Sequence, residues 1–272
     1  MSDSTPSQGL RGVEQFLHDG LLESLPTEYD RDALMQAQHA TYVIHQVVSY
    51  EYTKPVRDLR QRRVILPRRR HGDQHRILHR FDVRSCEVAQ VRSHTDIFGN
   101  SVLDATVPSV QHRIEFHTRA VITRSPRRAH RPAWNGTHPT MTQLTRPDDS
   151  IRDAAAQFGP AGDVLETADS IADFIRGSFE YCHDVTSVRT TAAEAWQLRR
   201  GVCQDMAHVM IAMCSSLGIA SRYVSGHLVG DGASHAWVEV FDPDRRTVVA
   251  IDPTHRRRTD LRYIPPAPRH AT

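Results

Sequence analysis

The fold of this 272-residue chain is decided by one stretch, Arg200-Gly-Val-Cys-Gln-Asp-Met-Ala-His-Val-Met-Ile-Ala-Met-Cys-Ser-Ser-Leu-Gly-Ile219. Apolar residues recur in it at helical spacing, and Gly218 is typical of the left-handed residue that ends a helix. Cys203 stands at the start, where unpaired backbone N–H groups and the helix dipole favour a thiolate. We therefore expect a core helix that carries Cys203 at its N-terminal end. Its predicted apolar face consists of Ala207, Met210, Ile211, Cys214 and Leu217.

The other cysteines lack this position at a helix start. Cys86, Cys182 and Cys214 form no C-x-x-C pair with one another or with Cys203, so we interpret them as structural thiols in a reducing compartment. The spacing of Cys182-His183 and Cys203 does not fit a structural zinc site, and His235-x-x-x-Glu239 is not a zinc-protease motif. We expect neither a metal nor another cofactor.

Three strands are predicted after the helix, at 220–229, 235–241 and 247–254. Asp242-Pro-Asp-Arg245 suits a type I turn between the second and third strands. A symmetric hairpin around Pro243 and Asp244 places His235 directly opposite Asp252 on the same face of the sheet. The carboxylate would orient the imidazole, and the imidazole would activate the Cys203 thiol.

The rest of the chain is predicted to form a leader, a β-rich domain and a linker before the catalytic core. Residues 1–38 hold a short amphipathic helix at 10–25, and 39–124 contain β-rich sequence that indicates a sandwich or small barrel. Prolines and arginines are frequent in the linker at 125–148, and the core occupies 149–272. Helices are expected at 163–181 and from Thr191, where Glu194 completes a capping box. Strands are expected at 41–52, 63–66, 76–83, 87–94 and 111–122.

Composition excludes several classes of protein. With 39% hydrophobic and 24% charged residues the chain can bury a core, and it lacks the long apolar run of a membrane helix. A formal net charge of only +2 argues against nucleic-acid binding. The opening residues lack the basic start and apolar centre of a secretion signal. We expect a cytoplasmic protein that binds neither membranes nor nucleic acid.

Three blocks stand in order along the chain: Gly201-Val-Cys-Gln-Asp205, Ser234-His-Ala-Trp-Val-Glu239 and Asp252-Pro-Thr254. They resemble the signature blocks of the bacterial transglutaminase-like superfamily, whose core is an α+β, papain-like thiol fold. The resemblance implies a Cys-bearing helix packed on an antiparallel sheet, with Cys203 as nucleophile, His235 as general base and acid, and Asp252 as the residue that orients His235. The earlier half is similar to the β-rich N-terminal region of bacterial members. The N-terminal similarity lies in Tyr42-Val-Ile-His45, Tyr50-x-Tyr52, Leu66-Pro67 and Asp96-x-Phe-Gly-Asn100.

The resemblance implies a cysteine-dependent enzyme that acts on an amide or isopeptide bond of a peptide or protein through an acyl-enzyme thioester. Hydrolysis is the leading expectation. The alternatives are transamidation of protein glutamine on the same triad, and a non-catalytic binding or assembly module that contacts a protein partner through its N-terminal half. The backbone N–H of Cys203 is one expected oxyanion donor. Candidates for a second donor or for substrate contacts are Tyr181, Gln197, Gln204 and Trp237.

Overall fold

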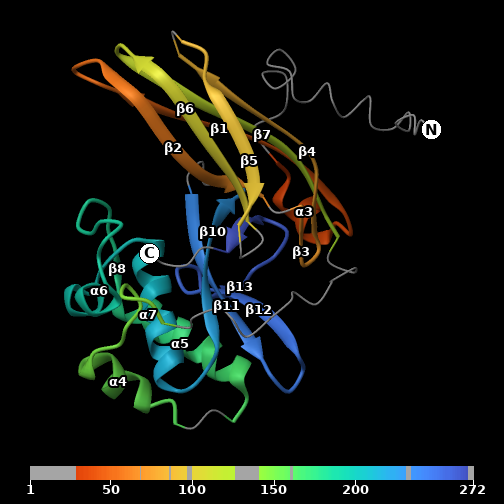
Figure 1. Ribbon diagram of the computed structural model, residues 1–272. Coiled ribbons are helices and arrows are strands. Elements are labelled where there is room, and N and C mark those ends of the chain that lie inside the picture. The colour runs from red at the N-terminus through yellow and green to blue at the C-terminus, as the bar shows by residue number, and fades with distance from the viewer. Residues whose placement is uncertain are drawn as a thin grey trace. The chain divides into compact units, whose positions relative to one another are not determined.

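A computed structural model (Figure 1) describes residues 29–67, 69–85, 87–96, 100–125, 141–159, 162–230 and 234–268. The chain divides into two compact units, residues 1–129 and 130–272, and the division falls inside the segment expected to be a linker. The helix expected at 10–25 and Cys86 lie outside the described residues. Within the described residues, no helix is long and apolar enough to cross a membrane.

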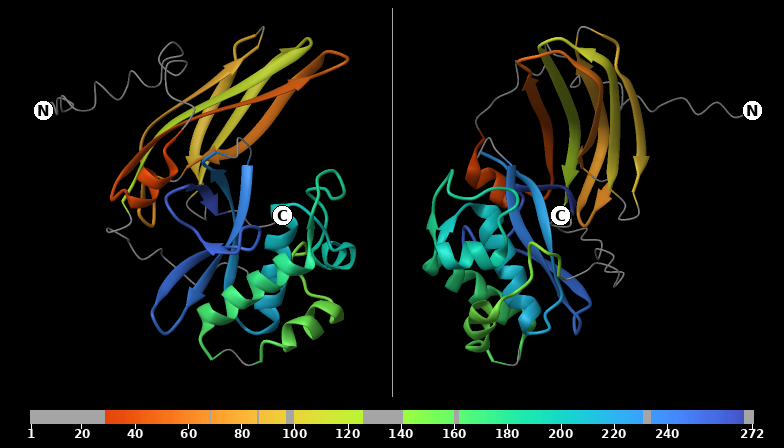
Figure 2. Two further views of the ribbon diagram at one scale, coloured as in Figure 1. Left: turned by 180° about the vertical axis from the view of Figure 1, so that it is seen from behind. Right: turned by 60° about the vertical axis from the view of Figure 1, so that its left-hand side comes forward.

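The first unit is a sandwich of two antiparallel sheets (Figure 2). One sheet has the order β1-β7-β4-β3 and the other the order β2-β6-β5. Apolar side chains from both sheets form its core, with Phe116 and Phe81 from the first and Val107 and Leu59 from the second. The elements are α3 (Arg31–Gln36), β1 (Ala40–Glu51), β2 (Val56–Leu66), β3 (Arg70–His71), β4 (Gln74–Arg84), β5 (Gln90–Thr95), β6 (Ser101–Val110) and β7 (Arg113–Arg124).

Strand β6 is the main element of this unit that the sequence analysis missed. It lies in the middle of its sheet and supplies Val107 and Val110 to the core. Pro108 interrupts its pattern, because proline cannot donate a hydrogen bond to a ladder. Pro108 and Asp58 are not paired in the β2–β6 ladder, and Asp58 adopts a positive φ of 51°. An irregularity at this point therefore accommodates the proline.

The second unit packs helices against a five-stranded antiparallel sheet of order β13-β12-β11-β10-β14. Helix α7 lies at its centre, in contact with β10 and β11 and with the helices α4, α5 and α6. The predicted α+β class is confirmed. The elements are α4 (Asp149–Ala156), α5 (Val164–Ser178), β8 (Glu180–Tyr181), α6 (Ala192–Leu198), β9 (Arg200–Gly201), α7 (Cys203–Ser216), β10 (Ser221–Leu228), β11 (Ser234–Asp242), β12 (Thr247–Asp252), β13 (Arg257–Arg258) and β14 (Tyr263–Pro268).

Local signals explain where these helices begin and end. The Thr191 hydroxyl accepts from the Glu194 backbone N–H, and the Glu194 carboxylate accepts from the Thr191 backbone N–H, as the capping box predicts. Asp163 caps α5, and Gly218 follows α7 with a φ of 73°. The sequence predicted that one face of α7 is buried. The buried surface is wider than this, since every residue from 205 to 214 is buried. Helices cover the sides of α7 that the sheet does not.

Candidate active site

Cys203 is the first residue of α7, and the preceding loop is held by Asp205. The Asp205 Oδ2 atom accepts hydrogen bonds from the Val202 backbone N–H at 2.8 Å and from the Thr186 hydroxyl at 2.7 Å. A side chain at position 201 would overlap the Asp205 carboxylate, so glycine is required there. Gly201 and Asp205 together fix the backbone that presents the thiol. Cys203 itself is buried, with 8% of its surface exposed.

His235 and Asp252 come from adjacent strands, but the predicted register is wrong by two residues. Asp242 pairs with Thr247 and Val238 with Ile251, so the turn contains four residues rather than two. Arg246 takes the fourth place with a left-handed φ of 49°. An even shift keeps both side chains on one face of the sheet. His235 Nε2 and Asp252 Oδ2 therefore still meet, diagonally, at 2.8 Å.

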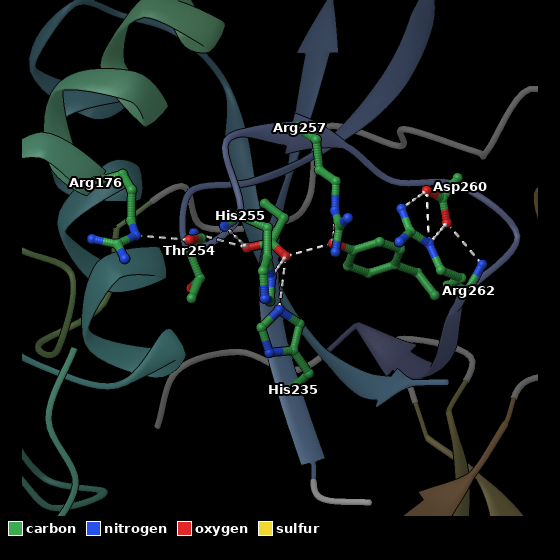
Figure 3. Close-up of polar contacts among 9 residues, drawn as sticks. Arg176, His235, Thr254, His255, Arg257, Asp260 and Arg262 are labelled. Carbon is green, nitrogen blue, oxygen red and sulfur yellow. Dashed lines mark hydrogen bonds and ion pairs between the residues drawn. The ribbon is translucent and has the colours of Figure 1, made fainter. Parts of the chain in front are cut away.

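Asp252 is a fully buried acceptor with hydrogen bonds to both oxygens (Figure 3). Besides His235 Nε2, its Oδ2 atom is bonded by His255 Nδ1 at 2.7 Å and by the Tyr263 hydroxyl at 2.6 Å. Its Oδ1 atom accepts from the backbone N–H groups of Thr254 at 2.8 Å and His255 at 3.3 Å. Strand β11, strand β14 and the segment that follows β12 thus converge on the Asp252 carboxylate.

The electrostatics of the site favour a charged histidine. Burial opposes the charge on His235, but the hydrogen bonds with Asp252 and Cys203 outweigh it and raise the pKa of His235 to about 9. Burial also opposes ionisation of Asp252, yet the hydrogen bonds from His235 and His255 hold the pKa of Asp252 well below its ordinary value. Burial and the nearby Asp252 charge raise the pKa of Tyr263 above its ordinary value, which keeps it a phenol. Since Nε2 of His235 is bonded to Asp252, its Nδ1 is left for Cys203.

The four side chains expected near the oxyanion or the substrate lie in different surroundings. Trp237 is buried, and its ring packs against the rings of His235 and Tyr263. Tyr181 is exposed and pairs through its backbone with Gly201. Gln204 Nε2 approaches the Ser187 carbonyl oxygen at 3.4 Å. Gln197 lines a surface cavity of about 520 Å³ together with Ser187, Arg189, Thr190, Glu194 and Leu198.

The other described cysteines differ from Cys203 in their environment. Cys214 is fully buried in the core, and burial raises the pKa of its thiol to about 12. Cys182 is partly exposed, and its sulfur accepts a hydrogen bond from Arg200 Nη2 at 3.3 Å. Of the three, Cys203 is the one hydrogen-bonded to an imidazole.

Among the described residues, His235, Asp252 and His255 form a group of side chains that could hold a metal ion, because their ligand atoms lie within 4.8 Å of one another. Both histidine nitrogens, however, stand only 2.7 and 2.8 Å from Asp252 Oδ2. Two ligands of one tetrahedral zinc ion are separated by about 3.3 Å, given metal–ligand distances near 2.0 Å. The observed distances fit shared protons, so we interpret the cluster as a hydrogen-bonded network.

Two residues of this network, His255 and Tyr263, were missed by the sequence analysis. His255 directly follows the Asp252-Pro-Thr254 block, so its spacing of three residues from Asp252 was a usable signal. Tyr263 lies eleven residues away, on a strand rich in proline. Its contact with Asp252 depends on the pairing of β14 with β10. Nothing in the local sequence indicates that pairing.

Comparisons with known proteins agree with this architecture. Residues 152–253 match the transglutaminase-like superfamily, and residues 42–123 match the bacterial transglutaminase-like N-terminal region. An uncharacterized protein of Mycobacterium tuberculosis strain H37Rv is 34% identical over 131 residues, which cover 43% of this chain and 42% of that protein. The chain thus matches less than half of that relative's length. An uncharacterized protein of Mycobacterium leprae is 38% identical over 80 residues, covering 26% of this chain and 29% of its own.

A solved structure shares the fold. The crystal structure of a candidate cysteine protease from Cytophaga hutchinsonii superposes with a TM-score of 0.65 at 19% identity, covering 84% of this chain and 83% of that one. At this level of identity the likeness establishes the fold alone.

Proposed function

We propose that this chain, which joins a transglutaminase-like core to the bacterial transglutaminase-like N-terminal region, is a cysteine-dependent enzyme that hydrolyses amide bonds. One observation carries the proposal. His235 faces the Cys203 thiol, which contributes to the raised pKa of His235, and it hydrogen-bonds the buried Asp252 carboxylate through Nε2. A thiol at a helix start, an imidazole and an orienting carboxylate are the parts that nucleophilic acyl transfer requires.

The first half of the proposed reaction forms a thioester. The Cys203 thiolate attacks the amide carbonyl carbon, and the resulting oxyanion is stabilised by the Cys203 backbone N–H, which has no acceptor within the first helical turn. The carbon–nitrogen bond then breaks, and the His235 imidazolium gives its proton to the leaving amine. Asp252 stabilises the imidazolium throughout the step, because its charge is buried and only 2.8 Å away.

The second half returns the free enzyme. Neutral His235 takes a proton from water, the hydroxide attacks the thioester, and the carboxylic acid leaves while the Cys203 sulfur is restored. An amine in place of water would give transamidation by the same steps. The class of acceptor is therefore a matter of access to the thioester, while the roles of Cys203, His235 and Asp252 stay the same.

A peptide library tests the proposal directly. We expect the wild type to cleave members of the library and to release a new carboxylate and a new amine, whereas Cys203→Ala should be inactive. Cys182→Ala is the matched control, because it removes a partly exposed thiol that does not contact His235. Incorporation of an added primary amine without hydrolysis would favour the transamidation alternative. Peptide binding without turnover in the wild type would favour a binding module.

A further inference from the structure

We infer that Tyr263, held in place by Arg257, is a positioning residue that sets how strongly Asp252 supports His235. The inference rests on the proposed function, since it assigns a further role within the same site. Arg257 Nε donates to the Tyr263 hydroxyl oxygen at 2.9 Å. That hydroxyl donates to Asp252 Oδ2 at 2.6 Å, and the same oxygen accepts from His235 Nε2 at 2.8 Å. Figure 3 shows Arg257 reaching this network from above and His235 reaching it from below.

The backbone explains why Arg257 acts through the tyrosine. The register of β12 and β13 places Arg257 directly opposite Asp252. Its guanidinium nevertheless binds the Tyr263 hydroxyl, and its Cζ lies 5.6 Å from the centre of the Tyr263 ring. The ring is 1% exposed and packs edge-on against Trp237. A buried phenol, anchored at its ring and at its oxygen, therefore separates a cation from the carboxylate.

The tyrosine proton has a definite effect on the charge of His235. The groups that face His235 are Cys203 from α7, Asp252 from β12, His255 after β12 and Tyr263 from β14. A donor to Asp252 stabilises the carboxylate most when His235 is neutral, because the negative charge then has no imidazolium partner. Removing that donor should favour the imidazolium. It should also free the carboxylate to rotate.

Two alkylating reagents report the charge on His235. Iodoacetate is an anion and reacts faster when the imidazolium lies beside the Cys203 thiolate, whereas iodoacetamide is neutral. The ratio of their rates at Cys203, measured by peptide mass spectrometry from pH 5 to 11, should fall as His235 loses its proton. For Tyr263→Phe we expect the midpoint of this fall to rise by about half to one pH unit, and peptide cleavage at pH 7.5 to drop roughly tenfold.

Arg257→Gln provides a second variant in case Tyr263→Phe folds poorly. It leaves the tyrosine in place but removes its anchor, so the midpoint should move in the same direction by a smaller amount. Arg258→Gln is the matched control, because the neighbouring Arg258 pairs with Asp169 and does not contact the site. If the iodoacetate preference falls with pH in the wild type and its midpoint is the same in both site variants, this inference is overturned while the proposed function still stands. Absence of any iodoacetate preference at Cys203 in the wild type would overturn the proposed function as well.

Discussion

Replacing Asp252 by asparagine should abolish the charge on His235 while preserving the shape of the side chain. The pKa of His235 rises from 6.5 to about 9 against the opposing effect of burial. At 1.36 kcal/mol per pH unit, this net shift corresponds to roughly 3 kcal/mol of support for the imidazolium, to which Asp252 and Cys203 both contribute. An asparagine amide carries no charge, and its NH₂ group would face donors if it occupied the Oδ2 position. Burial, the largest single effect on His235, should then outweigh the remaining support from Cys203, and the pKa of His235 should fall below 6.5.

The ratio of iodoacetate to iodoacetamide alkylation at Cys203 measures this change. At pH 7.5 the wild type should hold His235 almost wholly as imidazolium, while Asp252→Asn should hold less than about a tenth. The matched control is Asp242→Asn, which alters a buried aspartate of the same hairpin that binds Arg245. Asp242→Asn should change the melting temperature without changing the ratio. A midpoint near pH 9 in Asp252→Asn would refute the assignment of Asp252 as the group that supports His235.

Three further predictions follow from the same contacts. Gly226→Ala should lower the free energy of unfolding in urea by about 1–3 kcal/mol, because a Cβ there would overlap Trp237 and lie 2.6 Å from the Ile264 carbonyl oxygen; wild-type stability would contradict this. The contribution of His235 to stability is complete below pH 6.5 and is lost as the pH rises to about 9, so the melting temperature should fall across this window in the wild type but stay flatter in His235→Ala. Cys214 should resist iodoacetamide at pH 8 until urea unfolds the chain, because burial raises its pKa to about 12; labelling of the folded protein would show that the core opens.

Secondary structure was predictable at several positions where the signal was local, although α3 and α4, capped by Asp30 and Asp148, were not predicted. The capping box of Thr191 and Glu194 and the glycine stop at Gly218 both appear in the structure at the expected residues. Helix α7 itself was predicted, but its burial on all sides was not. A helix with polar residues such as Asp205 and His208 normally turns them toward solvent. Here Asp205 turns inward to hold the loop before Cys203, and both residues are buried.

The hairpin shows how a wrong register still gave a correct face. The predicted register of the hairpin assumed that Pro243 and Asp244 alone form the turn. The Asp242 carboxylate instead accepts from the backbone N–H groups of Asp244 and Arg245, which widens the turn to four residues. The period of a strand is two, so only an odd error would have separated His235 from Asp252. Whether these two side chains meet therefore depends on an even register shift, and not on the exact length of the turn.

The last strand marks the limit of inference from the sequence alone. Prolines at 265, 266 and 268 argue against a strand, because each lacks the N–H that a central ladder needs. Strand β14 is an edge strand, paired only with β10 within the described residues, so one side of its backbone requires no partner. This arrangement tolerates the prolines and carries Tyr263 to Asp252. A residue that orients the carboxylate thus comes from a segment whose composition indicates no regular structure, and only the pairing of β14 with β10 reveals it.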